Sequence, residues 1–332
     1  MVERCCIVNL TVLIPCYNEA ESIRSMYNEL KLVISEDSSK CSYNYELIFI
    51  DDGSYDTTLD IIKEFQQHDN HVKYISLSRN FGKEAAMLAG FSYSIGDAVV
   101  IIDADLQHPP RLIPEMIKYY IDGYDQVIGK RNRTGDSKTK TILSKLYYKI
   151  VNYLIDIKLT DGIGDFRLLS RRAINAILSM HEYNRFSKGI FSWIGFDSKI
   201  IEYKNQTRVN GDSKWNLRKL FHYGIDGILS FNNKPLTTTL YLGFVTAMCG
   251  ILYVIYSLIR ILIIGIDTPG YFTLITAILI IGGIQLISIG IIGQYIGRIY
   301  SEIKMRPHFI IKETNIISQK YINQGAGNDK KP

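Results

Sequence analysis

The sequence is poor in cysteine, with five among 332 residues, and none falls in a Cys-x-x-Cys pair or in a spacing typical of metal ligands. This pattern predicts reduced thiols in a cytosolic domain. Two glycine-rich phosphate loops are also missing, because no G-x-G-x-x-G follows the first predicted strand and no G-x-x-x-x-G-K-S/T occurs. A dinucleotide-binding Rossmann domain and a P-loop enzyme are therefore excluded.

A tract of charge of one sign is likewise missing. The net charge is only +5, and the lysines gather at residues 138–158 and around Arg218 and Lys219, where apolar residues lie between them. This placement disfavours nucleic-acid binding, whereas attraction to anionic lipid headgroups explains it. There is no evident internal repeat or low-complexity segment.

Two apolar runs dominate the second half of the chain, at residues 240–264 and 271–293. Each exceeds the roughly 20 residues that a helix needs to cross a bilayer. A pair of buried core helices is the alternative, but little of the chain would remain to bury them. Only Arg260, near one end, and Gln285, near the middle, interrupt the runs. We therefore expect two transmembrane helices.

The charges that flank the two runs predict their orientation. The link at residues 265–270 carries no Lys or Arg, whereas Lys234, Arg298, Lys304 and Arg306 lie outside the runs. The positive-inside rule therefore places both termini and the region before residue 235 in the cytoplasm, in a multi-pass protein of the plasma membrane. The start of the chain lacks an apolar stretch of adequate length, so we expect no signal peptide.

The first 130 residues alternate short apolar runs with helical patterns, which predicts an α/β fold with a mostly parallel, doubly wound sheet. The runs are almost continuously apolar, as in parallel strands covered on both faces. The predicted strands are 10–14, 46–50, 72–77, 98–102 and 126–128, and the predicted helices are 20–34, 57–67, 83–94 and 109–120.

Polar residues follow four of these strands, at 15–19, 51–54, 78–80 and 103–105. Ligands of such sheets bind outside the carboxyl ends of the strands, so we expect one site there. Asp103 and Asp105 come directly after a buried run. Two carboxylates in this position predict a site for a divalent cation that shares substrate phosphates. Taken alone, the pair could also be a solvated acidic turn.

Basic amphipathic patterns at residues 139–157 and 216–231 predict helices that lie in the membrane interface, with ordinary helices on the sheet as the alternative. The tail from Gln324 is expected to be disordered. The predicted organisation is a catalytic domain at 1–215, a juxtamembrane helix at 216–235, two spans within 236–297, and a cytoplasmic segment at 298–332.

Four motifs together resemble those of the family 2 glycosyltransferases of GT-A fold: IPCYNE at 14–19, DDGS at 51–54, DADLQHPP at 103–110 and GDFRL at 164–168. Within that family the chain is similar to the polyisoprenyl-phosphate glycosyltransferases, which include bactoprenol glucosyltransferases and dolichol-phosphate mannose synthases. The resemblance covers residues 8–310, including the closing motif at 297–302.

The resemblance implies roles for individual residues. Asp103, Asp105 and Gln107 would hold Mg²⁺ or Mn²⁺, which neutralises charge on a diphosphate leaving group. Asp165 matches the position of a catalytic base, but it could instead orient the acceptor or bind a hydroxyl of the donor sugar. The nucleotide side would include Pro15, Tyr17, Asn18, Glu19, Ile50, Asp52, Lys83 and Ala104. Phosphates of donor or acceptor would be held by Arg131, Arg133, Ser137, Lys145, Arg208 and Lys214.

The implied reaction is inverting transfer of a hexose from a nucleotide sugar, with UDP-glucose leading, to undecaprenyl or another polyprenyl phosphate at the cytoplasmic membrane face. UDP-N-acetylglucosamine, UDP-galactose and GDP-mannose remain alternative donors. A processive polysaccharide synthase is a rival, although the expected Gln-x-x-Arg-Trp motif is missing; a non-catalytic scaffold is another. Small residues at 282, 283, 288 and 290 would allow close helix approach, so we expect a homo-oligomer.

Overall fold

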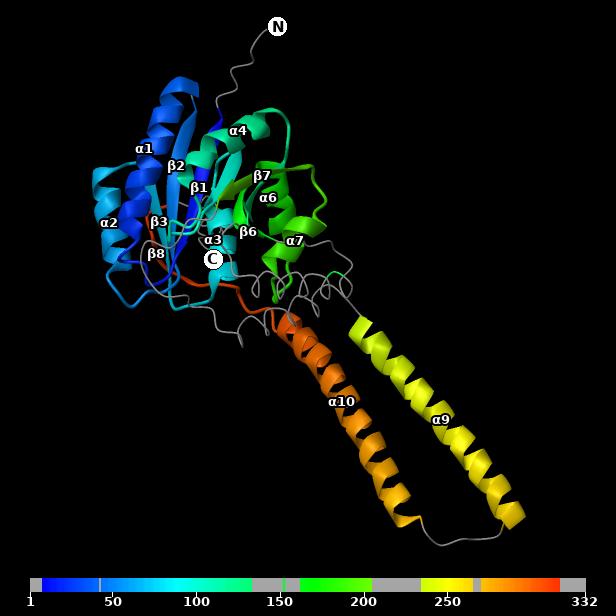
Figure 1. The fold of residues 1–332 in the computed structure, drawn as a ribbon. Helices are drawn as coiled ribbons and strands as arrows, with labels where there is room; N and C mark the ends of the chain where they lie inside the picture. The colour runs from blue at the N-terminus through cyan, green and yellow to red at the C-terminus, as the bar shows by residue number, and fades with distance from the viewer. Residues whose placement is uncertain are drawn as a thin grey trace, which may run out of the picture.

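The computed structural model shows an α/β domain from which two long helices project (Figure 1). The predicted interfacial helices, the link between the two apolar runs and the tail from Gln324 all lie outside the described residues. The structure describes residues 8–41, 43–132, 152, 162–204, 234–264 and 270–316.

The elements agree with the predicted order and extend it. The first helix begins at Ile23 rather than at residue 20, and the fifth strand continues to Asn132. In chain order the elements are β1 (Asn9–Cys16), α1 (Ile23–Cys41), β2 (Asn44–Asp51), α2 (Thr58–His68), β3 (Val72–Leu77), α3 (Lys83–Tyr93), β4 (Ala98–Ile101), the 3-10 helix η1 (Pro110–Leu112), α4 (Ile113–Ile121), β5 (Gln126–Asn132), β6 (Ile163–Ser170), α6 (Arg171–Leu178), α7 (Ser187–Trp193), β7 (Ser198–Lys204), α9 (Lys234–Ile264), α10 (Tyr271–Ile303) and β8 (Ile311–Thr314).

The strands form one eight-stranded sheet in the order β7-β5-β6-β4-β1-β2-β3-β8. β1 pairs in parallel with β2 and β4, and β2 pairs in parallel with β3. The predicted mostly parallel sheet is therefore confirmed. Two strands that the sequence pattern did not reveal run antiparallel: β6 lies between β4 and β5, and β8 lies beside β3.

Helices cover both faces of the sheet. Because successive residues of a strand point to opposite faces, each central strand contributes side chains to two separate cores. In β1, Val12 belongs to the core beneath α1, α2 and α4, whereas Leu13 belongs to the core beneath α3, α6 and α7. Val100 and Ile101 of β4 divide between the two cores in the same way. Burial on both sides explains why these strands are apolar without alternation.

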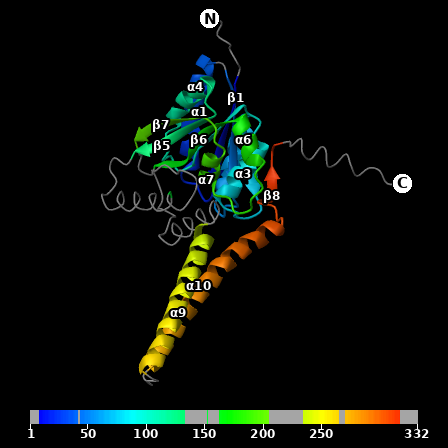
Figure 2. The same cartoon turned by 90° about the vertical axis from the view of Figure 1, so that its right-hand side faces the viewer.

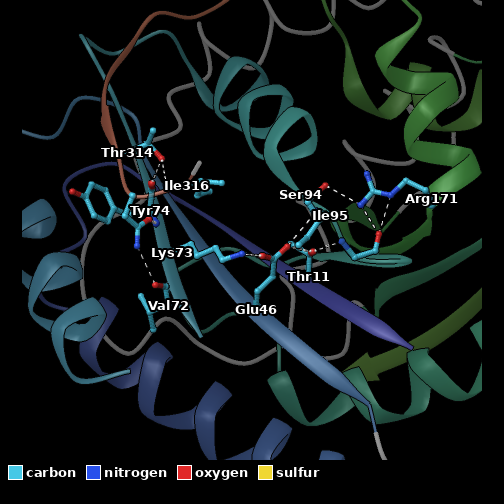
Figure 3. Close-up of polar contacts among 12 residues, drawn as sticks. Thr11, Glu46, Val72, Lys73, Tyr74, Ser94, Ile95, Arg171, Thr314 and Ile316 are labelled. Atoms are coloured by element: carbon cyan, nitrogen blue, oxygen red, sulfur yellow. Dashed lines mark hydrogen bonds and ion pairs between the residues drawn. The ribbon is translucent and has the colours of Figure 1, made fainter. Parts of the chain in front are cut away.

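A buried carboxylate joins three elements near the amino-terminal ends of the central strands (Figure 3). Glu46 accepts hydrogen bonds from the Thr11 hydroxyl at 2.6 Å, from the Lys73 ammonium at 2.5 Å and from the backbone N–H of Ile95 at 3.3 Å. The charge is thereby paired and hydrogen-bonded, as burial requires.

The chain returns from the projecting helices to the sheet, where residues 311–314 of the predicted C-terminal segment form β8 beside β3. The Thr314 hydroxyl donates to the carbonyl of Tyr74 at 2.7 Å, and the N–H of Tyr74 donates to Asn315 Oδ1 at 2.8 Å (Figure 3). The N–H of Ser78 donates to the carbonyl of Ile310 at 2.9 Å. β8 was missed because its four residues, Ile-Lys-Glu-Thr, contain no apolar run.

The projecting helices α9 and α10 have 31 and 33 residues and run antiparallel to each other as a hairpin (Figures 1 and 2). Each contains a window long and apolar enough to cross a membrane, at Leu236–Tyr253 and Ile280–Ile303, and neither window is buried in the described structure. Large side chains such as Leu262 and Leu286 are 78% and 72% exposed. The alternative of two buried core helices is thus ruled out.

Replacing Lys73 with methionine should lower the midpoint of thermal unfolding by about 6 °C or more. The change leaves the Glu46 carboxylate, whose side chain is 10% exposed, without its counter-charge. Breaking a buried pair from one side costs roughly 3 kcal/mol, and 1 kcal/mol corresponds to roughly 2–4 °C in a domain of this size.

The matched control is Lys63→Met, which breaks the pair between Lys63 and Glu313, both 35% exposed. A half-open pair contributes little, so we expect a shift below about 3 °C. Equal shifts in the two variants would contradict the importance of the buried network.

Candidate active site

The carboxyl ends of β1, β2 and β4 lie side by side, and this places the predicted strand-end residues together. Pro15 lies opposite Ile50 in the ladder between β1 and β2. Ala104 is buried just beyond β4, where the N–H of Ile102 donates to the carbonyl of Leu13 at 3.0 Å. The parallel strands thus bring motifs that are far apart in the sequence together at one edge of the sheet.

Antiparallel strand β6 brings Asp165 to the same edge. Ile101 of β4 pairs with Arg167 of β6. Asp103 comes two residues after Ile101, and Asp165 comes two residues before Arg167 on the antiparallel strand, so both lie at this edge of the sheet. Because side chains alternate between the faces, both carboxylates lie on the side covered by α3.

Lys83, the first residue of α3, joins the two carboxylates. Its Nζ lies 2.6 Å from Asp103 Oδ1 and 2.7 Å from Asp165 Oδ2. Burial opposes charge on these groups, but the opposite charges outweigh it: the pKa of Lys83 is raised, and the pKa values of Asp103 and Asp165 lie below the ordinary range. All three groups are therefore ionised near neutral pH.

The second oxygen of Asp103 faces His108, which the sequence analysis did not single out. His108 Nε2 lies 3.4 Å from Asp103 Oδ2, and Nδ1 lies 2.6 Å from the Tyr203 hydroxyl. Burial raises the pKa of Tyr203 to about 12, so this hydroxyl keeps its proton and can donate it to Nδ1. In the neutral imidazole the ring N–H is then on Nε2, facing Asp103. Phe166 stacks on the ring with centroids 5.1 Å apart.

Asp105 and Gln107 lie in a tight turn after Asp103. The N–H of Gln107 donates to Asp105 Oδ1 at 3.1 Å. Between them, Leu106 has a φ of +59°, which a branched side chain adopts at a cost. The turn holds the three predicted metal-ligating residues on one short loop.

Tyr17, Asn18 and Glu19 form the turn after β1. Asn18 has a φ of +52°; its N–H donates to the Ser54 hydroxyl at 2.9 Å, and its Oδ1 accepts the N–H of Tyr55 at 2.9 Å. The rings of Tyr17 and Tyr55 meet edge to face at 6.5 Å, and Tyr55 is 84% exposed. Two aromatic rings therefore lie at this corner of the edge.

Asp52 shapes the loop that leads into α3. Its two oxygens accept the backbone N–H groups of Phe81 at 2.7 Å and Gly82 at 2.9 Å. Burial raises its pKa to about 6, against the lowering effect of these two bonds. Asp52 was predicted to contact the nucleoside, which stays a prediction; its contacts in the structure fix the backbone immediately before Lys83.

Arg131 lies at the end of β5, opposite Tyr203 in the ladder with β7. It therefore reaches the side of the site occupied by His108 and Tyr203. The other predicted phosphate-binding residues lie outside the described residues: Arg133, Ser137, Lys145, Arg208 and Lys214.

One buried atom marks where a ligand would fit. Asp165 Oδ1 has no hydrogen-bond partner among the described residues, although Oδ2 is held by Lys83. A buried carboxylate oxygen left in this state is costly unless a ligand satisfies it. The geometry therefore offers an acceptor for a hydroxyl or another donor group beside Asp103.

The donor set also fits a cation that shares its coordination with substrate. Within the described part of the chain, no group of three His, Cys, Asp or Glu side chains could hold a metal by itself. Mg²⁺ is commonly held by one or two carboxylates plus substrate phosphates rather than by a full protein cage. Asp103, Asp105 and Gln107 carry oxygen donors of this kind on one short loop.

The fold and the acidic edge define a glycosyltransferase of GT-A type. The chain matches the family model described as glycosyl transferase family 2 over residues 11–178, half of its length, and the model described as GtrB C-terminal hairpin over residues 234–299. The protein therefore belongs to glycosyl transferase family 2 and is an enzyme.

Relatives match almost the whole chain. The CsbB protein of Bacillus subtilis (strain 168) is 53% identical over 92% of this chain and 92% of its own length. The SfII prophage-derived bactoprenol glucosyl transferase of Shigella flexneri is 40% identical over 93% of this chain and 99% of its own length. The prophage bactoprenol glucosyl transferase homolog of Escherichia coli (strain K12) is 40% identical over 92% and 99%.

Substituting Gly53 with alanine should destabilise the protein more than the same substitution at a turn glycine elsewhere in the chain. Gly53 has a φ of +69°, and a Cβ there would lie 2.7 Å from the backbone nitrogen of Asn80. Left-handed strain of roughly 1–2 kcal/mol adds to an overpacking cost of roughly 1–3 kcal/mol.

Gly123→Ala is the control for this substitution. Gly123 has a φ of +104°, but no atom lies within 4 Å of a Cβ built there. It should show the strain alone, so its thermal midpoint should fall about half as far. Equal falls would contradict the close approach of the two turns.

Proposed function

We propose that the protein transfers a hexose, with inversion, from a nucleoside-diphosphate sugar to a polyprenyl phosphate at the cytoplasmic face of the plasma membrane. UDP-glucose is the leading donor. The observation that carries this proposal is the meeting of Asp103, Lys83 and Asp165 at the carboxyl edge of the sheet, with one Asp165 oxygen left for a ligand.

The acceptor follows from the hairpin and from the relatives. α9 and α10 are long and apolar enough to anchor the catalytic domain on a bilayer. Two of the relatives named above carry the name of a bactoprenol glucosyl transferase or its homolog. An acceptor whose polyprenyl tail stays in the membrane is met at high effective concentration by a domain fixed there.

In the proposed reaction the bond between the anomeric carbon and the donor diphosphate breaks, and its electron pair leaves with the diphosphate. A phosphate oxygen of the acceptor forms the new bond from the opposite face, so no enzyme nucleophile is required. Mg²⁺ or Mn²⁺ held by Asp103, Asp105 and Gln107 would neutralise charge on the leaving diphosphate.

The protein groups supply position and charge. Lys83 fixes the two carboxylates relative to each other, and its side chain is 39% exposed, so that an anionic ligand can approach it. Asp165 uses Oδ1 either to orient the acceptor, to bind a donor hydroxyl or to act as a base. The acceptor phosphate is already anionic at neutral pH, so strong base assistance is not required.

Arg131, with its planar fork of donors, is proposed to bind phosphate oxygens. Arg133, Ser137, Lys145, Arg208 and Lys214 remain proposed phosphate contacts. The proposed contacts on the nucleotide side remain Pro15, Tyr17, Asn18, Glu19, Ile50, Asp52, Lys83 and Ala104. The small residues of α10 at positions 282, 283, 288 and 290 would allow another helix to approach closely, which supports a homo-oligomer as a further proposal.

The reaction can be tested with detergent-solubilised protein, polyprenyl phosphate, Mg²⁺ and a panel of radiolabelled nucleotide sugars. We expect label from one donor to enter the organic phase. Asp103→Asn should lower kcat by at least about 100-fold, as loss of a charge-stabilising group does, and Asp165→Asn by roughly 100- to 10,000-fold.

Asp122→Asn, at the exposed end of α4, is the matched control and should leave kcat unchanged. Label in a water-soluble polymer would instead establish a processive synthase. If no donor of the panel were used, the proposed reaction would be wrong.

Removal of divalent cations with a chelator should abolish transfer, and added Mg²⁺ or Mn²⁺ should restore it. Asp105→Asn should raise the metal concentration needed for half-maximal activity at least tenfold, because one anionic oxygen ligand is lost. Full activity in the chelator, or an unchanged metal requirement in the variant, would refute the assignment of Asp105.

A further inference from the structure

Glu84, the residue after Lys83, is a partly buried carboxyl group with no role in the reaction derived above. It lies in the first turn of α3. Its Oε1 accepts the backbone N–H of Ser187 at 3.2 Å, and its Oε2 is hydrogen-bonded to the Ser187 hydroxyl. Both oxygens of Glu84 are thus engaged by one residue, the first of α7.

The contact joins the two helices that flank the bridging lysine. α3 begins with Lys83, and α7 packs on the sheet through Ile190 and Phe191. The guanidinium of Arg167, on the same strand as Asp165, lies 4.0 Å from the centre of the Phe191 ring. The Glu84–Ser187 contact therefore closes a frame of α3, α7 and β6 around Lys83 and Asp165.

Charged groups surround Glu84 on several sides: Asp165 from β6, Lys83 from its own helix and Arg185 from the segment before α7. Loss of water contact, followed by repulsion from Asp165, raises the pKa of Glu84 to about 8. Glu84 therefore keeps its proton at neutral pH. A neutral carboxyl group still accepts the N–H and the hydroxyl of Ser187 through its two oxygens.

We propose that Glu84 is a positioning residue for the transfer reaction: as a neutral acid clasped to Ser187, it holds Lys83 on Asp103 and Asp165. This role rests on the proposed function. An ionised Glu84 would add a third carboxylate that competes with Asp103 and Asp165 for the single ammonium, and the frame would loosen. The neutral form is then the one that supports catalysis.

Kinetics of the full-length protein test the role through matched variants. Glu84→Gln retains a neutral, planar group with donor and acceptor, and should keep kcat within about threefold of the original at pH 7. Glu84→Ala breaks the clasp and should lower kcat at least tenfold, with little change in the donor KM. Ser187→Ala keeps the backbone contact and should fall between them, whereas Ser92→Ala, at the other end of α3, should have no effect.

The pH profile separates positioning from a general loss of structure. With a pKa of about 8, the neutral fraction of Glu84 falls about tenfold between pH 7 and pH 9. The kcat of the unsubstituted protein should therefore fall about tenfold over this range, whereas the kcat of Glu84→Gln should not. A Glu84→Gln variant as inactive at pH 7 as Glu84→Ala, or one with the same alkaline fall as the original, would overturn the proposal.

Thermal unfolding gives a readout that does not require transfer. The folded state holds the Glu84 proton up to about pH 8, whereas an unfolded glutamate releases it near pH 4.3. Stability should therefore decline as pH rises between these values, and level off above them, relative to Glu84→Gln. Parallel curves for the two proteins would refute the neutral clasp. Failure of transfer with every donor, together with diverging curves, would refute the proposed function while leaving the clasp established.

Discussion

The site depends on one ion pair network in which a single ammonium joins two carboxylates. Asp103 and Asp165 repel each other as anions, and their close approach requires a positive charge between them. Lys83 supplies it at 2.6 Å and 2.7 Å. The features nearest the site arrange this network: Asp52 fixes the backbone before Lys83, the antiparallel course of β6 delivers Asp165, and His108 faces the far oxygen of Asp103.

The strand ends can be recognised from the local sequence pattern. Many residues at the carboxyl edge of the sheet could therefore be predicted from the sequence. Apolar runs before Asp103 and before the turn at Asn18 reveal strands, and parallel strands end together. The bridge itself could not be predicted: the sequence analysis placed Lys83 on the nucleotide side of the site, but not between Asp103 and Asp165. Its partners depend on the register between β4 and β6, and no local pattern encodes the pairing of segments so far apart in the chain.

The same reasoning explains which residues were missed and which contacts of predicted residues were not foreseen. His108 lies within a recognised motif, but its contact with Tyr203 spans 95 positions and arises only when β7 joins the sheet. Asp52 looks like a ligand in sequence because it is a polar residue at a strand end. In the structure it bonds backbone N–H groups, a use that turn residues share with binding residues. Polar character at a strand end thus predicts the place of a site better than the role of each member.

The return of the chain to β3 makes the hairpin of α9 and α10 an insertion in the α/β domain rather than an appendage at its end. Because β8 follows α10, the ribosome makes this strand only after both long helices. Until then the edge of β3 exposes unpaired N–H and C=O groups, which is an aggregation hazard for a sheet. The sheet is therefore completed only after the hairpin has been synthesised, so the domain reaches its final form only once both long helices exist.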